Sequence, residues 1–309
     1  MSVANSPLVT VITVTYNSSA YVRDAIESIL ASSYPNFELI IGDDSSSDNT
    51  WEIVAGYRDP RIVKYRNEQN IGEYPNRNKA IQLAKGEYLI FIDGDDVIYP
   101  HGIAYFVSMM QAFPEAAMAI QKNYTNNILF PALLDSSEVI KNYFFGKYNL
   151  LSSSFASNFF KTDVLKRFML RMDIKSGDDE VRLRIGLQHA VLFVQGWVTW
   201  PRETPGQASA RIKPVGQLIA RWNYVMPLLD GIEDQAVVSE IRSTLNRSLA
   251  RFILKALFLF RIDDNIAVIN ELQFDFIAVF KDLFFVSTVL DISRKYNTVK
   301  PYKNGFLRV

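Results

Sequence analysis

Short apolar runs alternate with amphipathic stretches along the first hundred residues. Runs that favour strands are rich in β-branched and aromatic side chains: Leu8–Val14, Phe37–Ile41 and Arg61–Tyr65. Helices are expected between the runs: through Leu30, from Thr50 to before Asp59, and over Asn76–Ala84. A fourth apolar run begins at Glu87. Strands that alternate with helices in this way predict an α/β fold with a mostly parallel sheet and right-handed crossovers.

The pattern changes twice further along the chain. Residues from about 100 to 210 are less regular, with a helical pattern from Ser176 through Leu187 and a strand or hairpin expected over Val191–Trp200. From Val215 to about Tyr296 the pattern is helical with few breakers. These changes predict three regions: residues 1–110, residues 111–214 and a helical subdomain over residues 215–309.

The helical C-terminal third contains one long amphipathic helix, expected over about Val237–Phe260. Its apolar face consists of Ile241, Leu245, Leu249, Phe252, Ala256 and Leu259. Its basic side chains are Arg247, Arg251 and Lys255. Such a helix most often packs into a bundle, which we expect here, and peripheral contact with an anionic membrane is the alternative. A second, aromatic-rich helix, Phe274–Phe285, has three options: to pair with the first, to form a homodimer, or to cover an acceptor site.

Composition removes several classes of function. The chain has 33 basic and 33 acidic residues, which gives no signal for nucleic acid. It has no cysteine for disulfides or thiolate chemistry, and its two histidines exclude a histidine-rich zinc site. The N-terminus does not resemble a signal peptide, and no apolar stretch reaches the roughly 20 residues that span a bilayer. We expect a cytoplasmic protein, with a peripheral position at the inner face of the membrane as the alternative.

The strongest chemical signal lies at the end of the fourth apolar run. There the sequence Ile92-Asp93-Gly94-Asp95-Asp96 places three acids within four positions. Clustered carboxylates repel one another unless a cation neutralises them, and their oxygens suit Mg²⁺ or Mn²⁺. Ligands in open α/β sheets bind beyond the carboxyl ends of the strands. The motif therefore predicts a divalent metal site, whereas an ordinary acidic turn is the simpler interpretation.

Five motifs together resemble family-2 glycosyltransferases of the GT-A fold. They are Val11–Asn17, Asp43–Asp48, Asn70-Ile71-Gly72 with Asn76-Arg77-Asn78, Ala84–Tyr88 leading to Asp93–Asp96, and Gly177-Asp178-Asp179 with Arg182. Each motif is weak alone, but five in this order and spacing form a specific pattern over roughly the first two-thirds of the chain. The resemblance implies a Rossmann-like sheet in which residues 1–110 bind a nucleotide sugar and residues 111–214 face the acceptor.

The resemblance also assigns expected roles to individual residues. Nucleotide-sugar binding falls to Thr15, Tyr16, Asn17, Asp44, Arg77 and Asp95. Asp96 and Asp95 are expected to bind the metal, and Asp179 is expected to be the general base. Asp93, Asp178 and Arg202 are expected to support the site. Local chemistry leaves alternatives open: Tyr16 as a partly buried core side chain, Asp44 as a helix cap, and Asp178-Asp179-Glu180 as favourable acids at a helix N-terminus. Because other residues supply the caps beside Asp44, we expect its carboxylate to be left for a ligand.

The resemblance has one visible departure. Many relatives carry an arginine and then a histidine in the loop after the last core strand, and that histidine can complete the metal shell. Here the loop reads Arg202-Glu203-Thr204-Pro205-Gly206-Gln207-Ala208-Ser209, with the arginine but without the histidine. A metal held by Asp96, a diphosphate and water is still expected, with weaker binding.

The resulting hypothesis is an inverting glycosyltransferase. The expected donor is a nucleotide diphosphate sugar, with UDP the commonest nucleotide in the family, and the expected acceptor is a glycan or a lipid-linked saccharide of a bacterial surface polysaccharide. One alternative is a haloacid-dehalogenase-like phosphatase with Asp93 as nucleophile and Asp95 as acid/base. In that class, however, the motif follows the first strand, whereas three strands precede it here. A non-catalytic nucleotide-sugar-binding relative is the second alternative.

Overall fold

A computed structural model describes residues 6–122, 129–146, 149–174, 177–202, 204, 221 and 223–258, with the backbone alone for 249–258. The chain divides into two compact units, Met1–Arg211 and Ile212–Val309. The first unit contains the five motifs described above. A finer division of this unit near residue 110 stays a prediction.

The first unit alternates strands and helices as the hydrophobic pattern predicted. Its strands are β1 (Val9–Thr15), β2 (Phe37–Asp43), β3 (Ile62–Arg66), β4 (Tyr88–Phe91), β5 (Val97–Ile98), β6 (Ala116–Lys122), β7 (Ala132–Leu134), β8 (Asn158–Lys161), β9 (Ala190–Gln195) and β10 (Thr199–Trp200). Its helices are α1 (Val22–Leu30), α2 (Thr50–Gly56), α3 (Glu73–Leu83), α4 (Gly102–Ala112), α5 (Ser136–Phe145), α6 (Thr162–Phe168) and α7 (Gly177–Gly186), with a short 3₁₀ turn, η2, at Phe155–Ser157.

Among the described residues, eight strands form one sheet in the order β3-β2-β1-β4-β8-β6-β9-β7. The strands β3, β2, β1 and β4 are parallel neighbours, and β6 and β9 form another parallel pair. The strand β8 runs antiparallel to both β4 and β6, which joins the two parallel groups. The predicted α/β fold with a mostly parallel sheet is therefore confirmed. The order places β1, the first strand of the chain, between β2 and β4, where the connections reverse direction.

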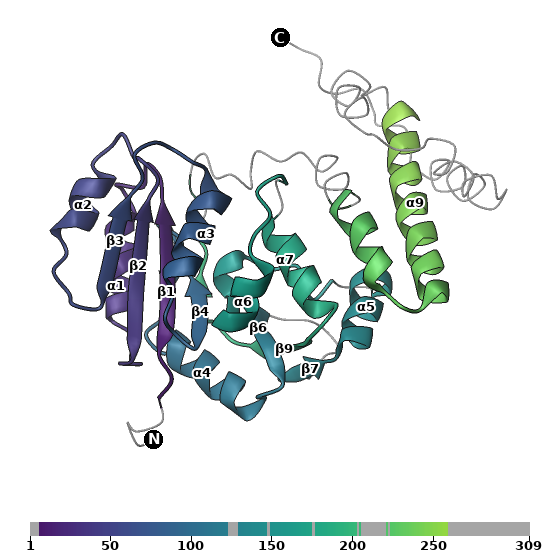
Figure 1. The fold of residues 1–309 in the computed structure, drawn as a ribbon, viewed down its shortest axis with the longest axis horizontal. Coiled ribbons are helices and arrows are strands. Elements are labelled where there is room, and N and C mark those ends of the chain that lie inside the picture. Colours follow the sequence, from purple (N-terminus) through teal and green to yellow (C-terminus); the bar gives the residue numbers. More distant parts are fainter. Residues whose placement is uncertain are drawn as a thin grey trace, which may run out of the picture. The chain divides into compact units, whose positions relative to one another are not determined.

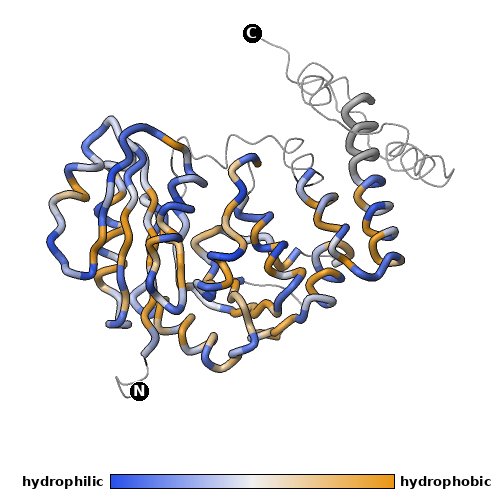
Figure 2. Tube along the Cα trace, in the orientation of Figure 1, coloured by the Kyte–Doolittle hydropathy of each residue, from blue (hydrophilic) through white to orange (hydrophobic). Residues whose placement is uncertain are grey.

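Helices cover both faces of the parallel half of the sheet (Figure 1). On one face, alternate residues of β1, β2 and β4 pack with α1, α2 and α4 into one apolar core. On the other face α3 packs against β1 and β2. Figure 2 shows long apolar stretches along the strands and α4, whereas α3 is mostly hydrophilic. Helix α3 buries the polar side chains of Asn76 and Arg77 together with Ala80 and Ile81, so it contributes polar groups as well as core volume.

Helix α3 begins three residues earlier than expected. The sequence pattern predicted a start at Asn76, with Pro75 as the last residue of the preceding loop. The helix instead starts at Glu73, with Gly72 as its N-cap. Proline is tolerated within the first turn, because the amide that it lacks would have no partner inside the helix.

The segment Val191–Trp200 forms neither a single strand nor a hairpin. Its first part, β9, pairs with β6 and β7 in the main sheet. Its last part, β10, pairs antiparallel with β5 instead, through Thr199 opposite Ile98 and Trp200 opposite Val97. Since β5 follows Asp96 directly, this small ribbon brings the segment after Trp200 beside the acidic motif.

The second unit contains the 3₁₀ turn η4 (Leu229–Gly231) and the helix α9 (Gln235–Phe258), which lies where a helix was predicted over about Val237–Phe260. Val238 and Ile241 are buried on α9. Within the described residues, no helix has both the length and the apolar character needed to cross a membrane. The side chains from Leu249 onward and the expected helix Phe274–Phe285 lie outside the described residues, so the choice between bundle, dimer and membrane contact stays open.

Candidate active site

The predicted site residues follow β1, β2 and β4, which are adjacent parallel strands. Thr15 lies opposite Asp43 in the β1–β2 register, and Ile12 lies opposite Phe91 in the β1–β4 register. The segments that continue from these strands therefore emerge at one edge of the sheet, as expected for parallel neighbours. This edge brings the loop after Thr15 together with the loop after Asp43 and the acidic motif.

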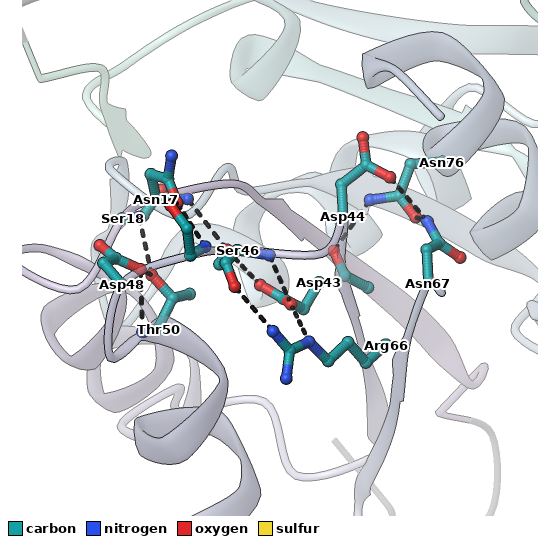
Figure 3. A network of polar contacts seen from close by, with 12 residues as sticks. Asn17, Ser18, Asp43, Asp44, Ser46, Asp48, Thr50, Arg66, Asn67 and Asn76 are labelled. Carbon is teal, nitrogen blue, oxygen red and sulfur yellow. Dashed lines mark hydrogen bonds and ion pairs between the residues drawn. The ribbon is translucent and has the colours of Figure 1, made fainter. Parts of the chain in front are cut away.

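Hydrogen bonds tie the loops after β1 and β2 together (Figure 3). The Asn17 amide donates to the hydroxyl oxygen of Ser46 at 2.9 Å, and the Asn17 side-chain oxygen accepts from the amide of Ser47 at 2.8 Å. The buried carboxylate of Asp43 accepts from the amide of Ser46 and pairs with Arg66 at 3.3 Å. Asn17 and Asp43 thus hold the shape of these loops. Tyr16, which directly precedes Asn17, has 51% of its surface exposed, so part of its ring is open to a ligand.

A second part of the same network fixes the start of α2. One Asp48 carboxylate oxygen accepts from the amide of Thr50 at 3.0 Å, and the other accepts from the amide of Ser19 at 3.1 Å. Burial alone would raise the pKa of Asp48, but the hydrogen bonds from Thr50 and Ser19 together lower it. Asp48, rather than Asp44, therefore binds the first amide of α2.

Asp44 is engaged by the protein itself. Its buried carboxylate accepts from the side-chain amide of Asn67 at 2.9 Å and from the backbone amides of Ile71 at 3.0 Å and Gly72 at 2.9 Å. The sequence suggested a carboxylate left for a ligand, whereas here it anchors the Asn70-Ile71-Gly72 loop to the end of β2. A carboxylate offers about four acceptor positions, so three protein donors leave room for one more.

The acidic motif is built around a buried glycine. A Cβ at Gly94 would lie 2.8 Å from the hydroxyl oxygen of Thr15, so only glycine lets the chain pass this close to β1. The first acid, Asp93, pairs with Arg77 on α3 at 2.7 Å. Arg77 therefore braces the acidic motif.

The other two acids are held by the segment after β10. The backbone amide of Arg202 donates to Asp96 at 3.0 Å, and the hydroxyl of Thr204 donates to Asp95 at 2.8 Å. Burial and the repulsion from Asp93 and Asp95 raise the pKa of Asp96 to about 7. The acids thus carry more negative charge than the neighbouring protein neutralises.

Arg202 uses its side chain for packing. Its guanidinium pairs with Asp24 at 3.2 Å, and it lies over the rings of Tyr21 and Trp200 at 5.1 and 5.7 Å. The contacts connect α1 to the ribbon of β5 and β10. The supporting role expected for Arg202 is thus compatible with its position, and its backbone rather than its side chain contacts the acids.

A divalent cation fits the donor chemistry of this motif. Within the portion of the chain that the structure describes, no three His, Cys, Asp or Glu side chains enclose a metal by themselves. Asp95 and Asp96 nevertheless offer the carboxylate oxygens that Mg²⁺ and Mn²⁺ prefer. Burial and then the neighbouring carboxylates of Asp93 and Asp95 raise the pKa of Asp96, and a cation would oppose that effect. Asp93 Oδ1 is buried and accepts no hydrogen bond from the described residues. A cation that shares its remaining ligands with a diphosphate and water is consistent with these facts.

The predicted base lies in the first turn of α7. Asp179 accepts from the hydroxyl of Tyr143 at 3.2 Å and from the guanidinium of Arg182 at 3.4 Å. The same guanidinium reaches Asp178 at 3.3 Å. Arg182 is almost fully enclosed, with 2% of its side chain exposed. These contacts fix the direction of both carboxylates.

Three residues near the start of α7 were missed from the sequence. Lys122 is the last residue of β6, and its Nζ donates to the Ser152 carbonyl. Burial and the positive charge of Arg182 lower the pKa of Lys122 to about 8, although the negative charge of Asp179 acts in the opposite direction. Tyr143 belongs to α5, and Tyr74 belongs to α3. Each is separated from the base by at least 36 positions in the chain, so no local motif marks it. The only usable signal was their type, since tyrosine and lysine readily bind carboxylates.

The arrangement is that of a known class of enzyme. The family model for glycosyl transferase family 2 matches residues 10–171, more than half of the chain, and the chain belongs to this family. The resemblance inferred from the five motifs is therefore confirmed.

Individual relatives match shorter stretches. The chain is 45% identical over 92 residues to the putative teichuronic acid biosynthesis glycosyltransferase TuaG of Bacillus subtilis, a match that covers 29% of this chain and 36% of TuaG. It is 42% identical over 89 residues to the UDP-Glc:alpha-D-GlcNAc-diphosphoundecaprenol beta-1,3-glucosyltransferase WfaP of Escherichia coli, covering 29% of this chain and 36% of WfaP. These matches thus span about a third of the relatives' own length.

Solved structures share the fold at lower identity. S. aureus TarS 1-349 in complex with UDP-GlcNAc aligns with a TM-score of 0.57 at 19% identity, covering 84% of this chain and 75% of that one. The mannosyltransferase PcManGT from Pyrobaculum calidifontis, in complex with GDP-Man and Mn²⁺, aligns with a TM-score of 0.59 at 16% identity, covering 97% and 83%. The GT-A fold expected from the sequence is confirmed. The phosphatase alternative is set aside, because both the family and the fold differ from it.

Proposed function

We propose that this protein transfers a sugar from a UDP-sugar to an acceptor hydroxyl with inversion at the anomeric carbon. The observation that carries the proposal is the position of Asp93–Asp96 at the end of β4, beside the loops after β1 and β2, in a member of glycosyl transferase family 2. The names of relatives supply the donor class, since WfaP uses UDP-Glc and TarS was crystallised with UDP-GlcNAc.

The donor side is assigned to the edge formed by the three strands. Exposed Tyr16 offers a ring on which the nucleobase can stack, and the remaining acceptor position of Asp44 suits a base N–H or a ribose hydroxyl. Thr15 and Asn17 shape the loop that carries Tyr16. Asp95 lies where ribose or metal can be bound. Arg77 holds Asp93, so its role is to keep the acidic motif in place for the diphosphate.

Asp95 and Asp96 are the residues that would hold a divalent cation. When bound, such an ion supplies positive charge that stabilises the departing nucleotide diphosphate. A structural relative was solved with Mn²⁺, which supports this choice of cofactor. The backbone amide of Arg202 and the hydroxyl of Thr204 orient the two carboxylates toward that task.

Asp179 is assigned as the general base. In the proposed step the acceptor hydroxyl gives its proton to an Asp179 oxygen while its own oxygen forms a bond to the anomeric carbon. The bond from that carbon to the diphosphate oxygen breaks at the same time, and its electron pair leaves with UDP. Tyr143 and Arg182 hold the base in a fixed direction, which such a displacement requires.

The acceptor class follows from the relatives. TuaG and WfaP are named for teichuronic acid synthesis and for a diphosphoundecaprenol-linked saccharide, so we assign a glycan or lipid-linked acceptor of surface polysaccharide synthesis. Residues 111–214 are assigned to the acceptor and 215–309 to a helical subdomain that packs in a bundle. Peripheral membrane contact through that subdomain would serve a lipid-linked acceptor.

A ligand screen followed by turnover tests the proposal. The unfolding temperature is measured with UDP, GDP and their sugars, with and without Mn²⁺, because a ligand of the folded state raises it. Release of UDP from the stabilising UDP-sugar is then compared between the wild type and Asp179→Asn. Stabilisation without turnover in the wild type would favour a non-catalytic binder. Stabilisation by no UDP compound would contradict the donor class.

A further inference from the structure

One helix contacts three parts of the candidate site. At its N-cap the amide of Gly72 donates to Asp44, and one turn later Arg77 pairs with Asp93. The next residue, Asn78, forms two hydrogen bonds with the backbone of Leu170, donating to its carbonyl at 2.8 Å and accepting from its amide at 2.9 Å. Helix α3 therefore links the donor edge of the sheet to the segment that leads into α7.

The contact of α3 with the base-bearing helix itself is made by Tyr74. Its hydroxyl oxygen accepts from the amide of Gly177, the first residue of α7, at 3.0 Å. The same hydroxyl donates to a carboxylate oxygen of Asp178 at 3.5 Å. Burial and the negative charge of Asp178 both raise the pKa of Tyr74, so the hydroxyl keeps the proton that it donates.

The glycine at the start of α7 makes this contact possible. A Cβ at Gly177 would lie 3.0 Å from the carbonyl oxygen of Arg171 and 3.2 Å from the Tyr74 ring. The Tyr74 ring thus packs directly on the backbone at the start of the helix. The first amides of a helix have no partner inside it, and here a side chain from α3 supplies one.

We propose that Tyr74 is a positioning residue that sets where Asp179 stands relative to the donor site. The proposal rests on the proposed function, because it assumes that Asp179 is the base. Tyr74 does not touch Asp179. It fixes Gly177 and Asp178, and Asp179 follows them in the same helical turn, where Arg182 holds both acids. Because Arg77 lies one turn further along α3, a single rigid element then spaces the base from the acidic motif.

The substitution Tyr74→Phe tests this role, since it keeps the ring and removes the hydroxyl. We expect amide hydrogen exchange at 177–180 to quicken by roughly tenfold, the equivalent of one net hydrogen bond. We expect kcat for UDP release from the UDP-sugar to fall by roughly ten- to a hundredfold, because small misplacements of a reacting group are costly. The Kd for UDP should stay within about twofold of the wild type, since the donor side keeps its contacts.

The matched control is Tyr34→Phe. The Tyr34 residue is buried, and its hydroxyl donates to the Pro7 carbonyl at 2.6 Å just before β1, at the opposite edge of the sheet. It should lower the unfolding temperature without changing kcat or the exchange at 177–180. A general loss of stability would affect both variants alike.

Two results would overturn the proposal for Tyr74: unchanged exchange at 177–180, or unchanged kcat despite faster exchange. Failure of the proposed function would look different. In that case Asp179→Asn would turn over like the wild type, or the wild type would release no UDP, while the exchange measurement would still show whether Tyr74 holds the start of α7. A fall in kcat together with an equal weakening of UDP binding would also contradict a role confined to the base.

Discussion

The guanidinium of Arg77 lies 2.7 Å from a carboxylate oxygen of Asp93, with only 4% of the arginine side chain exposed. A second carboxylate, that of Glu73, lies 2.9 Å away on the preceding turn of the same helix. The rings of Phe91 and Phe155 lie 5.2 and 5.0 Å from the guanidinium carbon. The pair therefore lies between the apolar interior and the acidic motif, where loss of one partner leaves the other charge poorly solvated.

Replacing Arg77 by methionine should destabilise the fold strongly. Asp93 would lose its neutralising partner, and breaking a buried pair in this way typically lowers the free energy of unfolding by about 3 kcal/mol or more. Chemical denaturation measures the change. Arg167→Met is the control, because Arg167 is 61% exposed and pairs only loosely with Asp163, so its loss should cost less than about 1 kcal/mol. Equal effects of the two substitutions would contradict the structural importance of the Arg77 pair.

Replacing Asp179 by asparagine should abolish transfer but keep donor binding. The shape stays nearly the same while the proton acceptor is lost, and general bases contribute roughly 10²- to 10⁴-fold to rate. Steady-state kinetics with the UDP-sugar should show the loss in kcat, with KM nearly unchanged. Asp173→Asn, at an exposed acid paired with Arg171, should behave like the wild type. Near-normal turnover by Asp179→Asn would transfer the base assignment to Asp178 or Glu180.

Removing the divalent metal should weaken UDP binding only when the acidic motif is intact. Calorimetric titration of the wild type with UDP should show a loss of at least about tenfold in affinity after treatment with EDTA, because the diphosphate loses its cation. In Asp96→Asn the affinity should already be low, and EDTA should change it little. Wild-type affinity that ignores EDTA would argue against the assignment of Asp95 and Asp96 as metal ligands.

Stability should depend on pH through Lys122. Its folded-state pKa of about 8 lies below the ordinary lysine value of 10.5. The unfolded chain therefore binds more protons between these values, so the contribution of Lys122 to stability should rise with pH from about 8 to about 10.5 and stay at its lower level below about 8. Unfolding temperatures of the wild type and Lys122→Met, measured from about pH 7 to about pH 10.5, should converge toward the upper end. Parallel curves would show that Lys122 titrates normally.

The parallel half of the sheet could be predicted because its information is local. Strands such as β1 and β2 are short apolar runs, and the helices between them are amphipathic, so alternation alone implied their order. The acidic motif was visible for the same reason, since its three carboxylates fall within four positions. Motif order then indicated the family, which the comparison over residues 10–171 confirmed.

The missed features depend on contacts between distant segments of the chain. Tyr74 and Asp178 are 104 positions apart, and the amide of Arg202 reaches Asp96 across 106 positions. Neither the helical nor the strand period of the hydrophobic pattern reveals which distant residues will be in contact. Asp44 was expected to be left for a ligand, and the reason that this was incomplete is related. Local capping rules described the residues beside it, but its own hydrogen-bond donors come from the loop 67–72. The pairing of β10 with β5 likewise joins segments that local patterns cannot connect.

The shared helix α3 makes the site intolerant of changes in length. Adding or removing one residue between Tyr74 and Arg77 would rotate everything beyond it by about 100° and shift it by about 1.5 Å along the axis. Arg77 could then no longer face Asp93 while Tyr74 faces α7. Homologous enzymes should thus keep the spacing between these two positions of the helix constant.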